Sequence, residues 1–161
     1  MDKEQIRNKT SKPLLWIGMA SIGMAFAGLT SGYVVSKSSL VSAGAWQTIP
    51  LPNEFLISTI FIVISSALLI MAMNRLKVEK YKSSNLMIWF AFVFGCAFLY
   101  TQVLGWNDLM KNQGVFFTGE QSRPAGSWLY VITWFHWIHA LAGVIVLLVA
   151  SIRSSKGFFT G

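Results

Sequence analysis

Four long apolar runs limit what this chain can fold into more than any other feature. They cover Leu14–Val35, Phe55–Met73, Leu86–Trp106 and Trp128–Ile152, and none contains Asp, Glu, Lys or Arg. Each run has at least 19 residues, and about 20 helical residues cross the hydrocarbon core of a bilayer. Because lipid offers no partners for backbone amides, such a run must cross as a helix. We therefore predict an all-α integral membrane protein, with four transmembrane helices in a bundle and a single transmembrane domain over residues 1–161.

The first run has a second interpretation, as a secretory signal peptide, because basic residues precede it. The apolar part of a signal peptide has only about 7–15 residues, fewer than this run, and no convincing small-x-small cleavage site closes the run. We expect a retained helix instead. Pro13 suits the first turn of that helix, where its missing N–H group is not needed.

The basic residues predict how the helices are oriented. Ten of the 13 Lys and Arg residues lie on the side that holds both chain ends: Lys3, Arg7, Lys9, Lys12, Arg75, Lys77, Lys80, Lys82, Arg153 and Lys156. The other side has Lys37, Lys111 and Arg123. The positive-inside rule then places both termini in the cytoplasm. The net charge is +7. Because the basic residues lie at the ends of the apolar runs, where the positive-inside rule operates, we expect no nucleic-acid partner.

The only two histidines, His136 and His139, lie in the fourth run. On a helix, Thr133, His136, His139 and Gly143 form one stripe. A haem with two histidine ligands needs them on opposite sides of the iron, and two histidines three residues apart point the same way. A copper, zinc or iron site needs further His, Cys or carboxylate ligands, and every Asp and Glu lies in a loop or at a helix end. We expect no haem, metal or catalytic centre in this chain.

The alternative for the histidines is a structural role. A polar group at membrane depth is costly without a partner, so the stripe should face protein or water. Other polar residues within the runs are Gln102, Ser65 and Ser66. We predict an interhelical hydrogen-bonded cluster of Thr133, His136, His139, Gln102, Ser65 and Ser66. We also predict close helix packing at Gly28, Gly32 and Gly143, because small residues let helices approach each other.

Three segments resemble subunit III of haem–copper terminal oxidases (cytochrome c oxidase subunit III), in its compact bacterial form. They are "LPNEFLISTIFIVISSALLIMA" at 51–72, "FGCAFLYTQVLGW" at 94–106 and "GSWLYVITWFHWIHALAG" at 126–143, with a weaker match in "FAGLTSGYVV" at 26–35. The likeness extends from about Ile17 to Ile152, and the motif with the two histidines is its most specific part.

The resemblance implies a function and a set of partners. Members of this family are accessory subunits of proton-pumping cytochrome c oxidases in aerobic respiratory chains. They pack on subunit I and other oxidase subunits, bind phospholipid, and support proton uptake and the stability of the active site. Haem and copper lie in the partner subunits. The implied location is the bacterial cytoplasmic (inner) membrane.

The sequence also departs from the family pattern. Members usually have seven helices, or five in compact bacterial forms, and this chain has four runs. Many members carry a glutamate in the helix that corresponds to the first run, and no acidic residue lies near Ser21 or Ile22. Trp134 and Trp137 stand where glycine is common, which should alter helix approach.

Two other classes remain as alternatives. One is a haem b membrane anchor of a quinone-reactive dehydrogenase, which would need histidines on separate helices. The other is a small membrane transporter, which would be expected to have a carboxylate in a span and inverted repeats. The sequence has none of these features.

Overall fold

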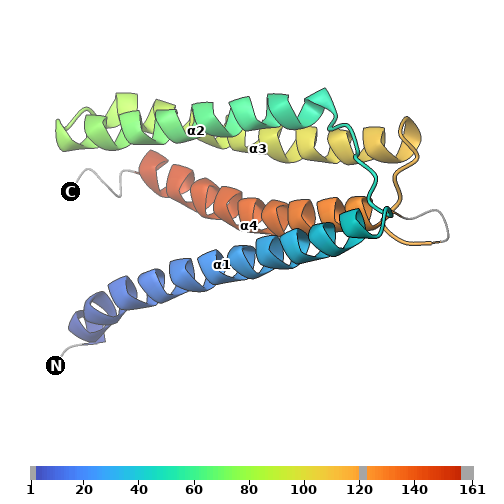
Figure 1. Cartoon of the computed structure of the whole chain (residues 1–161). Coiled ribbons are helices and arrows are strands. Elements are labelled where there is room, and N and C mark those ends of the chain that lie inside the picture. The colour runs from blue at the N-terminus through green and yellow to red at the C-terminus, as the bar shows by residue number, and fades with distance from the viewer. Residues whose placement is uncertain (1–2, 120–122, 157–161) are drawn as a thin grey trace. The chain divides into compact units, whose positions relative to one another are not determined.

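The computed structural model describes residues 3–119 and 123–156, with side chains from residue 12 onward. The helices are α1 (Lys3–Ser42), α2 (Asn53–Lys77), α3 (Tyr81–Lys111) and α4 (Pro124–Ser155) (Figure 1). All four are long and apolar enough to cross a membrane, as predicted. This architecture is in keeping with a multi-pass membrane protein. The chain divides into two units, Met1–Thr48 and Ile49–Gly161, and each is described by itself.

The first unit consists of α1 and the segment that follows it. The helix begins at Lys3, so Pro13 lies inside it, and the prediction that Pro13 occupies the first turn was wrong. The polar residues before Pro13 continue the helix toward the N-terminus, and a proline inside a helix favours a bend. At the other end, the ring of Trp46 meets Tyr33 edge-on at a centroid distance of 5.7 Å. This contact folds the segment after α1 back onto its last turns.

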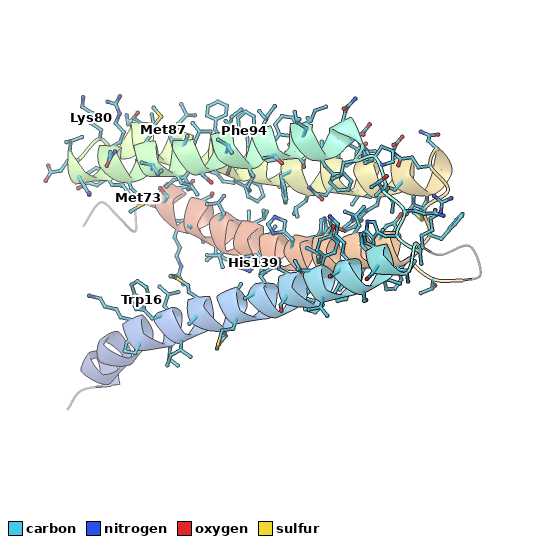
Figure 2. The ribbon with its side chains drawn as sticks, in the orientation of Figure 1. Trp16, Met73, Lys80, Met87, Phe94 and His139 are labelled. Carbon is cyan, nitrogen blue, oxygen red and sulfur yellow. The ribbon has the colours of Figure 1, made fainter. Side chains whose placement is uncertain are left out.

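The second unit begins with a hairpin of α2 and α3. The turn between them is only three residues long, and Glu79 adopts a left-handed conformation with φ 58°. The amides of Glu79 and Lys80 donate to Leu76 and Arg75, which caps the end of α2. Figure 2 shows Lys80 at this turn. The basic segment between the second and third apolar runs, residues 74–85, is therefore mostly helical.

Helix α3 is the centre of the second unit, because both α2 and α4 pack against it. Its buried residues recur every three or four positions: Ser84, Ile88, Ala91, Gly95, Phe98, Gln102, Gly105 and Leu109. This is the 3.5-residue period of a coiled-coil seam. On α2 the buried residues are Ser58, Ser65 and Ala72, spaced seven apart. Small side chains predominate, which allows the two helices to approach closely.

The outer face of the second unit is apolar and largely uncovered. Exposed side chains include Leu56 on α2, Val93 on α3 and Val146 on α4. A soluble domain would bury such residues, whereas lipid or a neighbouring subunit can cover them in a membrane. The arrangement therefore directs small and polar groups inward and hydrocarbon outward, as a membrane environment requires.

Candidate functional site

A ladder of side-chain hydrogen bonds connects α2 and α3 along their seam. At one end Gln102 binds Ser58, and in the middle the Oγ of Ser65 donates to the carbonyl of Ala91 over 2.8 Å. At the turn end, the Oγ of Ser84 donates to the carbonyl of Ala72 over 2.9 Å. On α2 the three steps lie seven residues apart, so the ladder follows the coiled-coil period.

The step between Gln102 and Ser58 is fully buried. The amide Nε2 of Gln102 donates to the Oγ of Ser58 over 2.7 Å. The same hydroxyl donates to the carbonyl of Phe55 over 2.8 Å, so Ser58 acts as acceptor and donor at once. Next to it, the ring of Phe55 lies against Gly105, where an added Cβ would come within 3.2 Å of the ring. The hydrogen bonds therefore require a polar side chain at position 58, and the ring of Phe55 leaves little room for a side chain at position 105.

Tryptophans connect α3 to α4. The indole Nε1 of Trp106 donates to the Oγ1 of Thr133 over 3.1 Å, and the Nε1 of Trp137 donates to the carbonyl of Leu99 over 3.3 Å. The ring of Trp106 also stacks on Trp134 at 6.3 Å and lies 6.1 Å from Trp137. Trp106 therefore contacts two large rings of α4, those of Trp134 and Trp137.

The loop between α3 and α4 is fastened to the start of α4. The hydroxyl of Tyr130 donates to the carbonyl of Val115 over 3.0 Å, and the Oγ of Ser127 donates to the carbonyl of Phe117 over 2.9 Å. The side chain of Val115 covers Gly126, where an added Cβ would come within 2.6 Å of it. No other residue fits at position 126 without a shift of Val115.

The two histidines lie near the middle of α4, and Figure 2 labels His139. The imidazole of His136 meets the ring of Phe98 edge-on at 5.8 Å. Both histidines also have interactions besides this one. Even so, both side chains are exposed in the chain alone.

The predicted polar residues lie on two sides of α3. Thr133 and His136 contact α3 from α4, through Trp106 and Phe98. The hydrogen bonds of Gln102 and Ser65 run between α2 and α3, and Ser66 is exposed. A single cluster that includes both histidines stays a prediction.

Sequence reasoning missed several residues of these contacts. Ser58 and Ser84 complete the ladder, and Tyr130 and Gly126 hold the loop between α3 and α4. The seven-residue spacing of Ser58, Ser65 and Ala72 could have indicated from the sequence that these residues share one face of α2.

The glycines singled out for helix packing are Gly28 and Gly32 on α1 and Gly143 on α4. A Cβ added at Gly28 or at Gly143 would meet no heavy atom of the described residues within 4 Å, apart from its own helix backbone and chain neighbours. The close packing predicted at Gly28, Gly32 and Gly143 therefore stays a prediction.

The chemistry available in these contacts is structural. Among the described side chains, those of residues 12–119 and 123–156, no three of His, Cys, Asp or Glu come together in a way that could hold a metal ion. Cys96 is an exposed free thiol on α3. What the contacts provide is a set of directional hydrogen bonds in a setting where water does not compete, together with closely fitted small residues. These contacts are those of a helical membrane protein in which side chains hold neighbouring helices in register.

Comparison with known proteins finds a distant relative. The chain is 27% identical over 143 residues to cytochrome c oxidase subunit 3 of Corynebacterium diphtheriae. The match covers 85% of this chain and 66% of the relative, so the chain spans just under two thirds of that protein's length. No family model matches the chain, and no solved structure matches it either.

Proposed function

We propose that this chain is a non-catalytic accessory subunit of a proton-pumping haem–copper cytochrome c oxidase, equivalent to subunit III. It works in the aerobic respiratory chain, packs on subunit I and other oxidase subunits, and binds phospholipid. It lies in the bacterial cytoplasmic membrane with both termini in the cytoplasm. The haem and copper of the complex belong to the partner subunits, and this chain supports proton uptake and the stability of the active site.

The observation that carries the proposal is the likeness to cytochrome c oxidase subunit 3, which extends over 85% of the chain. The positions of the motif residues support it. In the segment 94–106, Gly95, Phe98 and Gln102 are all buried on α3. In the segment 126–143, Tyr130 and Thr133 make the contacts of α4 with the loop and with α3. Several of the residues in the segments that carry the resemblance thus position the helices.

The exposed surface is a second support. Helix α4 presents two histidines and several large apolar side chains, among them Trp134 and Phe135 at 53% exposure each. A helix of a neighbouring subunit can cover both the polar and the apolar side chains of this face. Such a surface is in keeping with a chain that works inside a larger membrane assembly.

The proposed support of proton uptake does not run through a carboxylate in a span. The described acidic side chains are Glu54, Glu79 and Asp108, which lie in the first turn of α2, in the α2–α3 turn and in the last turns of α3. The chain therefore acts by packing: it keeps the surface of subunit I covered and its neighbouring lipid ordered. Loss of this cover would first shorten the active lifetime of the enzyme.

Removal of the chain tests this function. Membranes from a strain without it should consume oxygen with reduced cytochrome c at a nearly normal initial rate, and the activity should then decline faster during turnover. Re-expression of the chain should restore the lifetime. An unchanged lifetime together with a normal initial rate would contradict the proposal.

A further inference from the structure

The two ends of the α3–α4 pair are held together in different ways. Toward the loop, the ring of Trp106 contacts two tryptophans of α4, and hydrogen bonds join the helices. At the other end, where α3 begins and α4 ends, a polar link crosses between them. The indole Nε1 of Trp89 donates to the Oγ of Ser155 over 3.0 Å, and this hydroxyl donates to the Oδ1 of Asn85 over 3.2 Å. We call these three residues the Ser155 link.

Next to this link, α3 and α4 approach each other through small side chains. A Cβ added at Gly95 would come within 3.1 Å of the Cγ2 of Val144, and Ser151 is fully buried. The hydroxyl of Ser151 donates to the carbonyl of Leu147 in its own helix, so this bond does not join the two helices. Because lipid is as apolar as these side chains, their packing has no hydrophobic driving force. The Ser155 link therefore matters for how this end of the pair stays closed.

The Ser155 link lies where water can compete with it. Helix α4 has 32 residues and ends at Ser155, so it is about 48 Å long and exceeds the hydrocarbon core of about 30 Å. The side chain of Ser155 is exposed, and Trp89 is 36% exposed. Water can replace each partner when the link opens, whereas a buried bond such as that of Gln102 would leave an unsatisfied group. Opening therefore costs little and is reversible.

Charge acts against the link. Lys82 lies about one helical turn before Asn85 on α3, and Lys156 directly follows Ser155. Further basic residues at this end are Arg75, Lys77, Lys80 and Arg153, and the described carboxylate of the α2–α3 turn is that of Glu79. Like charges repel one another, and salt screens this repulsion between exposed groups. Hydrogen bonds that close this end are thus opposed by a repulsion that depends on ionic strength.

We propose that the Ser155 link is a latch for the end of α4. When the latch is closed, it holds the last turns of α4 on the first turns of α3. When it is open, this end of α4 separates from α3, while the rings around Trp106 hold the other end. Low salt opens the latch and high salt closes it. The latch goes beyond the proposed function, because it rests on contacts within this chain and does not depend on an oxidase role.

Distances between spin labels test the latch. In the full-length chain with Cys96→Ser, the changes Leu86→Cys on α3 and Ile152→Cys on α4 place labels at exposed positions near the latch. A second pair, Val103→Cys with Phe135→Cys, reports on the other end of the two helices. Pulsed electron spin resonance of the chain in phosphatidylcholine nanodiscs should show a closed distance and a longer, open distance for the first pair. The second pair should show a single distance.

Variants identify what closes and opens the latch. Ser155→Ala should raise the ratio of open to closed chains roughly two- to tenfold, as expected for hydrogen bonds that water can replace. Ser154→Ala, at the neighbouring position, is the matched control and should leave the ratio unchanged. Ser155→Thr keeps a hydroxyl and should restore the closed distance. Lys82→Gln should lower the ratio at low salt and weaken the effect of added salt.

Three outcomes would overturn the proposal. Equal ratios for Ser155→Ala and Ser154→Ala would exclude the latch. The same lengthening at both label pairs would show that α4 moves as a whole and has no latch at one end. A ratio that neither salt nor Lys82→Gln changes would exclude repulsion as the force that opens it. Because every distance is measured on this chain alone, failure of the latch is distinguishable from failure of the oxidase assignment.

Discussion

Gln102 of α3 donates a hydrogen bond to the hydroxyl of Ser58 on α2 over 2.7 Å, and both side chains are buried. The hydroxyl donates its own proton to the carbonyl of Phe55. The loss of one side chain therefore affects the hydrogen bonds of the other to a different extent. Without Gln102 the serine keeps one of its bonds, whereas without the serine the buried amide of Gln102 loses the acceptor of its Nε2 group.

This inequality predicts the effects of substitution. Ser58→Ala should destabilise the chain by about 1–3 kcal/mol, because it leaves a buried amide without a partner. Gln102→Leu should cost less, near the range of about 0.6–1.7 kcal/mol for a hydrogen bond between membrane helices. The free energy of unfolding in mixed micelles measures both. Ser66→Ala, at an exposed site on the same helix, is the control, and a loss from Ser58→Ala no larger than from this control would contradict the hydrogen-bonded ladder.

Gly126 gives a prediction about packing. Gly126→Ala should destabilise the chain by about 1–3 kcal/mol, because the new Cβ would overlap Val115. Adding Val115→Ala should recover part of the loss. Gly143→Ala, whose new Cβ would meet no heavy atom of the described residues within 4 Å, should have little effect in the same unfolding assay. Equal losses at positions 126 and 143 would show that the loop does not pack on α4 in this way.

The distribution of Lys and Arg predicts the topology. In a variant in which Cys96→Ser removes the native thiol, a cysteine introduced by Ser42→Cys should react with an impermeant reagent added outside intact cells. A cysteine introduced by Ser83→Cys should react only after the membrane is opened, because ten of the 13 basic residues lie on its side. The reverse pattern of labelling would invert the topology.

The histidines should affect retention more than chemistry. A double variant, His136→Ala with His139→Ala, should leave the initial rate of oxygen consumption nearly normal in complexes that keep the chain. Its activity should decline faster, and less of the chain should remain after detergent extraction, because the variant would lose the interhelical bonds that we predict for the histidines, worth about 0.6–1.7 kcal/mol each. Ile145→Ala, at an exposed apolar position of α4, is the matched control. Abolished initial turnover with full retention would instead indicate direct participation in proton or electron transfer.

The number of helices could be predicted from the sequence, because the thickness of a bilayer sets the length of an uncharged run. The ends of the helices could not. Pro124 begins α4 one turn before the predicted start at Trp128, because proline is well suited to the first position of a helix. The turn at Glu79 is likewise only three residues long, although the polar segment between the two runs extends over residues 74–85.

The site was predicted only in part, because the sequence alone does not show which faces of the helices meet. Gln102 and Ser65 were singled out as polar residues of the runs, and both are buried, but their partners depend on the register between α2 and α3. That register follows from the spacing of Ser58, Ser65 and Ala72, which a search for polar residues alone does not reveal. The roles of His136 and His139 depend on what covers α4, and the sequence of one chain does not contain its partner.

The most direct test of the proposed function is purification of the intact assembly through a tag on this chain. Gentle detergent extraction should yield the visible spectrum of a haem–copper oxidase, with subunit I identified by mass spectrometry. A subsequent treatment that releases this chain should leave the haem and copper with subunit I. A haem spectrum that follows the released chain, or purification of the chain with dehydrogenase subunits or without partners, would contradict its assignment as a non-catalytic oxidase subunit.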